Sequence, residues 1–179
     1  MTIFVLLNLS LMNNQDIDKY FLGLPYRKAN DKQIDFIKSS KTFVPTSNKN
    51  ILPMQFFHSK YKDVKAVDVD CDSISVIITS SFYSTMNQIS YTVEDTKVIY
   101  YYNNRDLQTV KFKAIEKQLL DKKYRTVYTT IGDDTNRPES RMKGVEFMLT
   151  KKEFPKISLL QTTRYNYYEV RLEYSKTKK

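Results

Sequence analysis

The chain has 179 residues and only three glycines, which excludes the glycine-rich loops that wrap nucleotide phosphates. Cys71 is the only cysteine and His58 the only histidine, which excludes an internal disulfide and a zinc site built from several such ligands. The net charge is +9, and residues 97–179 supply all of it, because residues 1–96 hold ten basic and ten acidic residues. A basic half favours an acidic partner, such as nucleic acid, anionic lipid or an acidic protein, or else a lysine-rich solvated surface.

The first fifteen residues have two interpretations. "MTIFVLLNLSLM" is almost entirely apolar, as in the central region of a signal peptide, but no basic residue precedes it and no A-x-A-like site follows. The alternation of apolar residues from Ile3 to Leu11 also fits an N-terminal strand. The stretch is too short to span a membrane. We therefore interpret residues 1–15 as a signal-peptide remnant, with a strand of the folded domain as the alternative.

Two stretches have the hydrophobic spacing of helices. "NDKQIDFIKSSK" (residues 30–41) offers Asn30 or Asp31 as N-cap and places Ile34, Ile37 and Phe36 on the apolar side. "RDLQTVKFKAIEKQLLDKKY" (residues 105–124) offers Asp106 as N-cap. Its predicted apolar stripe consists of Leu107, Val110, Ala114, Ile115 and Leu119, with Lys111, Lys113 and Lys117 away from it.

Alternating apolar and polar residues predict strands in most of the remaining chain. The expected strands are residues 64–70, 73–81, 87–102 with a turn at Glu94–Thr96, 124–131, 142–152, 156–164 and 166–175. In the last of them Tyr168, Val170, Leu172 and Tyr174 share one face, which indicates an antiparallel sheet that is buried on one side.

The order helix, strands, helix, strands predicts an α+β fold with an antiparallel sheet or sheets and two helices. The helices start near residues 31 and 106, and two arrangements are open. One is a single sheet without a repeat. The other is two tandem units of one helix and four strands, at 16–103 and 104–175, followed by a basic tail at 176–179.

The tandem arrangement is similar to that of the secreted β-lactamase-inhibitor-like proteins, which are built from two helix-plus-four-strand units. "FLGLPYRKANDKQIDFIK" (residues 21–38) resembles the short lead-in before the first helix in some bacterial secreted domains of this kind. The resemblance covers the layout of about 150 residues. It implies a protein-binding role but carries over no functional residue.

The residues that are chemically capable of catalysis do not match the pattern of a catalytic or metal site. Cys71 stands between two aspartates, whose negative charges disfavour the thiolate that a pair with His58 would need. The acidic run "DVDCDS" lacks the glycine and the final glutamate of a calcium loop. Asp133, Asp134 and Glu139, in the polar stretch 131–144, could act as paired carboxylates in a hydrolase, but a solvated loop explains them as well.

Tyrosine and arginine are concentrated near the C-terminus, and this combination is typical of protein interfaces and of single-strand nucleic-acid surfaces. The predicted partner-binding residues are Arg164, Tyr165, Tyr167 and Arg171 from this region, with Arg137 and Arg141 from the polar stretch. We therefore predict a non-catalytic, secreted or periplasmic module that binds another protein and uses no metal or cofactor. The alternative is a cytoplasmic nucleic-acid-binding domain that uses the basic C-terminal half.

Overall fold

The computed structural model describes residues 15–40, 43–45, 54–59, 70–84, 90–122, 124–133, 141–148, 155–164 and 167–178. The helices are α2 (Gln15–Asp18), the 3-10 turn η1 (Lys19–Phe21), α3 (Asn30–Ser39) and α4 (Arg105–Asp121). The strands are β1 (Phe43–Pro45), β2 (Met54–Ser59), β3 (Ser73–Ser84), β4 (Ser90–Tyr102), β5 (Arg125–Asp133), β6 (Arg141–Met148), β7 (Lys156–Arg164) and β8 (Tyr167–Lys178). Residues 1–14 lie outside the described part, so the choice between signal peptide and strand stays a prediction.

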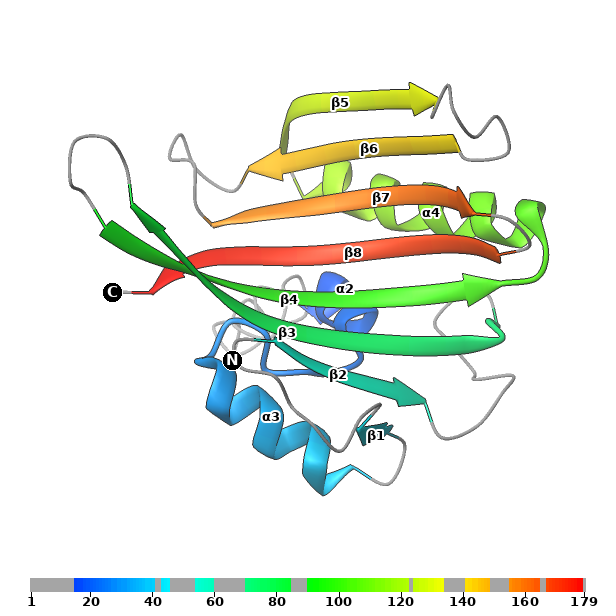
Figure 1. Ribbon diagram of the computed structural model, residues 1–179. Coiled ribbons are helices and arrows are strands. Elements are labelled where there is room, and N and C mark those ends of the chain that lie inside the picture. The colour runs from blue at the N-terminus through cyan, green and yellow to red at the C-terminus, as the bar shows by residue number, and fades with distance from the viewer. Residues whose placement is uncertain are drawn as a thin grey trace, which may run out of the picture.

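All the described strands form one antiparallel sheet in the order β1-β2-β3-β4-β8-β7-β6-β5 (Figure 1). The α+β fold with an antiparallel sheet is therefore confirmed. Each long helix is followed by four strands, α3 by β1–β4 and α4 by β5–β8, and the two sets meet where β4 pairs with β8. One hydrophobic core runs through both sets, so the halves are joined by packing as well as by the sheet.

The two faces of the sheet differ in what covers them. Aligned residues from neighbouring strands form the centre of one face, and all are buried: Val76, Val98, Leu172, Leu159 and Val145. Helix α4 packs on this face against β4, β7 and β8, and it lies behind β7 in Figure 1. Helix α3 reaches the same face, where Gln33 accepts a hydrogen bond from Thr96 of β4. We call this the helix-covered face; over the opposite one, the open face, the structure describes no helix.

The two long helices use a glutamine in the same way. Gln33 and Gln108 are each the fourth residue of their helix, and both side chains are fully buried. Gln108 donates to the backbone carbonyls of Thr162 and Glu169, at 2.8 and 2.9 Å. These bonds attach the first turn of α4 to β7 and β8, just as Gln33 attaches α3 to β4.

Helix α4 is rotated about its axis relative to the orientation that its apolar stripe predicts. Leu107 and Val110 are 40% and 51% exposed, whereas Gln108, Lys111 and Phe112 face the core. The reason is that Lys111 has an aromatic site to enter: its Nζ lies 4.9 Å from the ring centre of Tyr20 and 4.6 Å from that of Tyr100. Cation–π attraction and the long apolar stem allow this lysine to be buried.

The predicted helix caps are also wrong. Asn104, not Asp106, caps α4 by accepting hydrogen bonds from the backbone N–H groups of Asp106 and Leu107. In α3 the cap position is Ala29, and the side chain of Asn30 instead donates to Thr79 and Ser80 of β3.

Two further departures concern the strands. β4 is continuous through Glu94–Thr96, where the sequence predicts a turn, because these polar side chains find partners beside the sheet. β8 continues to Lys178, through most of the stretch interpreted as a basic tail. The short strands β1 and β2 have no counterpart among the predictions, and residues 64–69 lie outside the described part. None of the described helices is long and apolar enough to cross a membrane.

Candidate functional site

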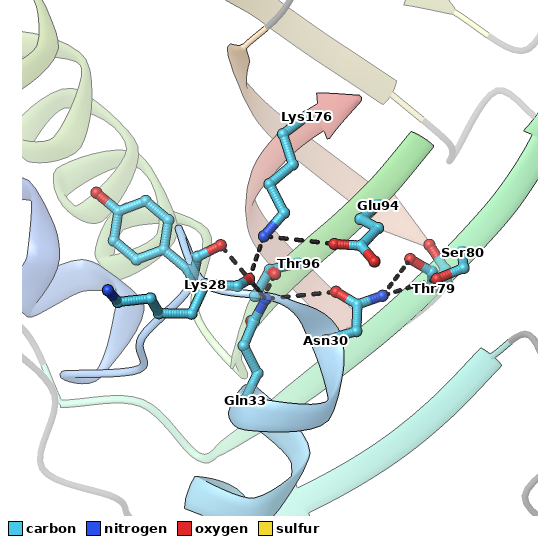
Figure 2. A network of polar contacts seen from close by, with 9 residues as sticks. Lys28, Asn30, Gln33, Thr79, Ser80, Glu94, Thr96 and Lys176 are labelled. Atoms are coloured by element: carbon cyan, nitrogen blue, oxygen red, sulfur yellow. Dashed lines mark hydrogen bonds and ion pairs between the residues drawn. The ribbon is translucent and has the colours of Figure 1, made fainter. Parts of the chain in front are cut away.

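Two clusters of polar side chains lie near the ends of β3, β4 and β8, one on each face of the sheet. The first is the network between α3 and the ends of β3, β4 and β8 (Figure 2). Gln33 is its centre: the amide nitrogen donates to the carbonyl oxygens of Tyr26 and Lys28, at 3.3 and 3.1 Å, and the amide oxygen accepts from Thr96 Oγ1 at 2.7 Å. Every polar atom of this buried side chain is therefore used in holding the helix.

An ion pair closes the network. Lys176 Nζ lies 3.5 Å from Glu94 Oε2 and also donates to the carbonyl oxygen of Lys28. Burial lowers the pKa of Lys176, and the neighbouring Glu94 carboxylate offsets part of this effect. Because the groups satisfy one another and Gln33 is fully buried, the network attaches α3 to the sheet and offers little to a ligand.

The second cluster is on the open face, where β3, β4, β8 and β7 lie side by side. One row across these strands consists of Thr79, Asp95, Ser175 and Lys156. The adjacent row consists of Ile77, Lys97, Glu173 and Ser158. Except for Ile77, both rows therefore consist of charged and hydroxyl side chains.

A pocket of about 230 Å³ opens on this face. Its lining comes from the hairpin end of β3 and β4 and from the adjoining ends of β7 and β8: Tyr83, Tyr91, Val93, Asp95, Lys156, Glu173 and Ser175. Cofactor and drug-sized pockets usually measure about 300–1,000 Å³, so this one suits a single side chain or a small group.

Aromatic side chains stand at both ends of the open face. Tyr83 and Tyr91 stack at the pocket, with ring centres 5.5 Å apart. Tyr167, at the start of β8, is 64% exposed. Exposed tyrosines of this kind provide large contact areas with few rotatable bonds, which favours binding.

The charges on the open face balance. Among the described side chains its acidic members are Asp95, Glu169 and Glu173, and its basic members are Lys97, Lys156 and Arg171. Lys97 Nζ lies 3.3 Å from Glu173 Oε1, and Arg171 lies 3.8 Å from Glu169 Oε2. The guanidinium of Arg171 also has a buried Nε without a hydrogen-bond partner in the structure.

The structure brings two of the predicted binding residues together on this face. Tyr167 and Arg171 share the open face of β8, and Arg164 is the register partner of Tyr167 in β7. Arg141 begins β6, where it pairs with Thr163. Arg137 and Tyr165 lie outside the described residues. The assignment of these six residues to a binding site stays a prediction.

The predicted catalytic candidates gain no support within the described part. Burial raises the pKa of the Cys71 thiol to about 12, with smaller contributions from the two flanking aspartates and an opposing one from Lys111. The thiol is therefore protonated at neutral pH, and the main cause is burial rather than the flanking aspartates. Asp133 lies in β5, while Asp134 and Glu139 fall outside the described residues. No group of three acidic, histidine or cysteine side chains suited to a metal occurs among the residues described.

Sequence reasoning missed the pocket residues on β3, β4 and β7. Tyr91, Val93 and Asp95 belong to a stretch predicted as two strands with a turn, so their common face was not visible. The alternation that starts at Tyr91 is interrupted by the polar run Glu94–Lys97, so the sequence contains no clear signal for this face. Comparison of the chain with protein-family models, with curated proteins and with solved structures finds no match.

Proposed function

We propose that this protein is a non-catalytic binding module that docks on another protein through the open face of its sheet. The observation that carries the proposal is the make-up of that face, in which stacked and exposed tyrosines flank a band of alternating charges around a pocket. Aromatic and arginine side chains contribute most of the binding energy in protein interfaces, and complementary charges fix the register of the partner.

The charge balance of the open face favours a protein over nucleic acid. Binding to phosphates requires an excess of lysine and arginine, because affinity comes from the release of counterions. Among its described side chains the open face has as many acidic groups as basic ones. Nucleic acid would meet three carboxylates there, whereas a protein surface can offer groups of both signs.

A secreted or periplasmic location belongs to the same proposal. It is supported by the apolar stretch at residues 1–12 and by the similarity of the layout, one helix and four strands repeated, to secreted β-lactamase-inhibitor-like proteins. The intact mass of the native protein, measured after fractionation of the source cells, tests it. Loss of about the first 14 residues from protein in the periplasm or medium supports secretion. A full-length cytoplasmic protein contradicts it.

Site-specific photo-crosslinking tests the docking surface. One variant carries a photo-reactive phenylalanine at Tyr91 on the open face, and a matched variant carries it at Leu107, which is exposed on α4. We expect one discrete protein to crosslink in envelope extracts from position 91 only, to persist after nuclease treatment, and to disappear when Arg171→Glu is added. Equal capture from both positions, or none from position 91, contradicts the proposal.

A titration with nucleic acid tests the alternative function. Single- and double-stranded DNA and RNA should give no saturable binding at about 50 mM salt, where phosphate contacts are strong. Saturable binding that weakens steeply with added salt would favour the alternative based on the basic C-terminal half.

A further inference from the structure

Asp95 is a buried acid at the centre of the open face. Only 9% of the residue is exposed, and its carboxylate forms part of the pocket wall. Within the described part of the chain, its one hydrogen bond comes from the Thr79 hydroxyl, at 3.2 Å to Oδ2, and no cationic side chain pairs with it. Oδ1 therefore remains available to a group that enters the pocket.

Asp95 meets no cation in the described part of the chain, although it lies in the wall of the pocket. Removing an ionised carboxylate from water is costly unless a cation or several hydrogen-bond donors replace the water. One hydroxyl supplies a single hydrogen bond to one of the two oxygens and does not neutralise the charge. By contrast, Glu173 on the neighbouring strand has both Lys97 and the Ser175 hydroxyl as partners.

The rest of the lining is suited to a flat cation with an apolar stem. The stacked rings of Tyr83 and Tyr91 provide π faces, which attract cations. Val93 lies between these rings and Asp95 along β4 and offers apolar surface to methylene groups. Glu173 brings a second carboxylate, so the lining holds two acidic groups and one basic group, Lys156.

We propose that this pocket receives the side chain of an arginine from the protein partner. The guanidinium pairs with Asp95 Oδ1 and the methylene stem lies along Val93, against the tyrosine rings. The inference rests on the proposed function, because it names the part of the partner that the open face recognises.

Arginine fits these walls better than lysine does. Its guanidinium is planar, stacks on aromatic rings, donates two parallel hydrogen bonds to a carboxylate and loses less hydration on burial than an ammonium group. An anionic side chain would meet two carboxylates, and a large apolar side chain would bury Asp95 without neutralising it.

An NMR titration with a small probe tests the inference without a partner protein. The probe is N-acetyl-arginine amide, and the comparison compound is N-acetyl-citrulline amide, which has nearly the same shape and no charge. We expect saturable shifts of the backbone amide signals of Asp95, Tyr91 and Glu173 with the arginine compound, at millimolar concentrations, and none with citrulline. Equal shifts with both compounds, or no saturable shifts, overturn the inference.

Matched variants test whether Asp95 is the carboxylate that binds the guanidinium of the probe. Asp95→Asn keeps the shape and the acceptor for Thr79 but removes the charge, and it should weaken probe binding at least about tenfold. Asp106→Asn removes one negative charge from the exposed start of α4 and should change binding less than about twofold. Because Asp95→Asn is nearly isosteric, its amide spectrum also checks the fold, and Glu173→Gln provides a second variant. Equal weakening by Asp95→Asn and Asp106→Asn contradicts the inference.

The outcomes also separate this inference from the proposed function. If position 91 crosslinks one partner but the arginine probe does not bind, the docking surface stands and the arginine pocket is wrong. If the probe binds and no partner is captured from either position, the pocket recognises a guanidinium and the protein-binding proposal is wrong.

Discussion

Leu172 and Glu173 are neighbours in β8, but Leu172 is fully buried under the helices and Glu173 forms an ion pair on the open face. The same contrast holds along β4, β7 and β8. On the helix-covered face the glutamines, Glu94 and Lys176 find partners within the chain. On the open face, the described contacts of Asp95 are limited to one hydrogen bond from Thr79, and the buried Nε of Arg171 has no hydrogen-bond partner. The comparison shows that the polar groups of one face attach a helix to the sheet, whereas those of the other face border a pocket.

The largest expected effect is a difference in stability between substitutions of two adjacent residues whose side chains lie on opposite faces of the sheet. Leu172→Ala removes a buried side chain from the centre of the core and should lower the free energy of unfolding by about 2–5 kcal/mol. Glu173→Ala, the control on the other face, should lower it by less than about 1 kcal/mol, since its ion pair is partly solvated. Denaturant unfolding measures both, and similar losses for the two variants would contradict the division into faces.

A smaller loss is expected from the polar network of the helix-covered face. Gln33→Ala leaves the Thr96 hydroxyl and the carbonyl oxygen of Tyr26 without their partner and should cost about 1–3 kcal/mol. The matched control is Lys32→Ala, an exposed position in the same helix turn, for which we expect almost no change. If the two variants unfold at the same denaturant concentration, the network does not hold α3.

Stability at alkaline pH provides a further test of the tyrosines on the helix-covered side of the sheet. Burial raises the pKa of Tyr26, Tyr124 and Tyr174, and for Tyr26 the hydrogen bond to Asp18 adds to the effect. Above about pH 10 the unfolded chain releases these protons first, so the folded state binds more protons and its stability falls as the pH rises. Melting temperatures from pH 8 to 11 measure this loss, and Tyr26→Phe should make it less steep. Tyr167→Phe, which alters an exposed ring, should leave the slope unchanged.

The smallest effect concerns the open-face ion pair. A double-mutant cycle with Lys97→Ala and Glu173→Ala should give a coupling energy of about 0.2–1 kcal/mol, which decreases with added salt. A value of several kcal/mol would mean that the open face stabilises the fold as strongly as the core does, and the contrast between the faces would disappear.

The sequence predicted the parts of the fold that depend on simple periodicity. β8 was found because apolar and polar residues alternate along most of it, β7 from its short apolar run, and both long helices from their apolar spacing. The rotation of α4 could not be predicted, because Lys111 is buried by the rings of Tyr20 and Tyr100, which come from distant parts of the sequence. The burial of a lysine between two such rings cannot be recognised from the residues next to it in the sequence.

The pocket was not predicted, for a similar reason. Tyr167 and Arg171 were chosen from the composition of one strand and do not line it, because the pocket depends on the register of four strands. Asp95 looked like part of a turn, since "VEDTK" is polar in sequence. Its place in the pocket wall becomes visible only when β8 lies beside β4.

The pairing of β4 with β8 has a consequence for how the chain folds. These central strands are separated by the residues between Tyr102 and Tyr167, so the middle of the sheet is closed by a contact between distant parts of the sequence. Until β8 has been made, β4 presents a long unpaired edge that any compatible strand can occupy. In concentrated refolding mixtures β8 of a second molecule can fill this edge, which gives an exchanged dimer of complementary halves. Slow, dilute renaturation therefore favours the monomer.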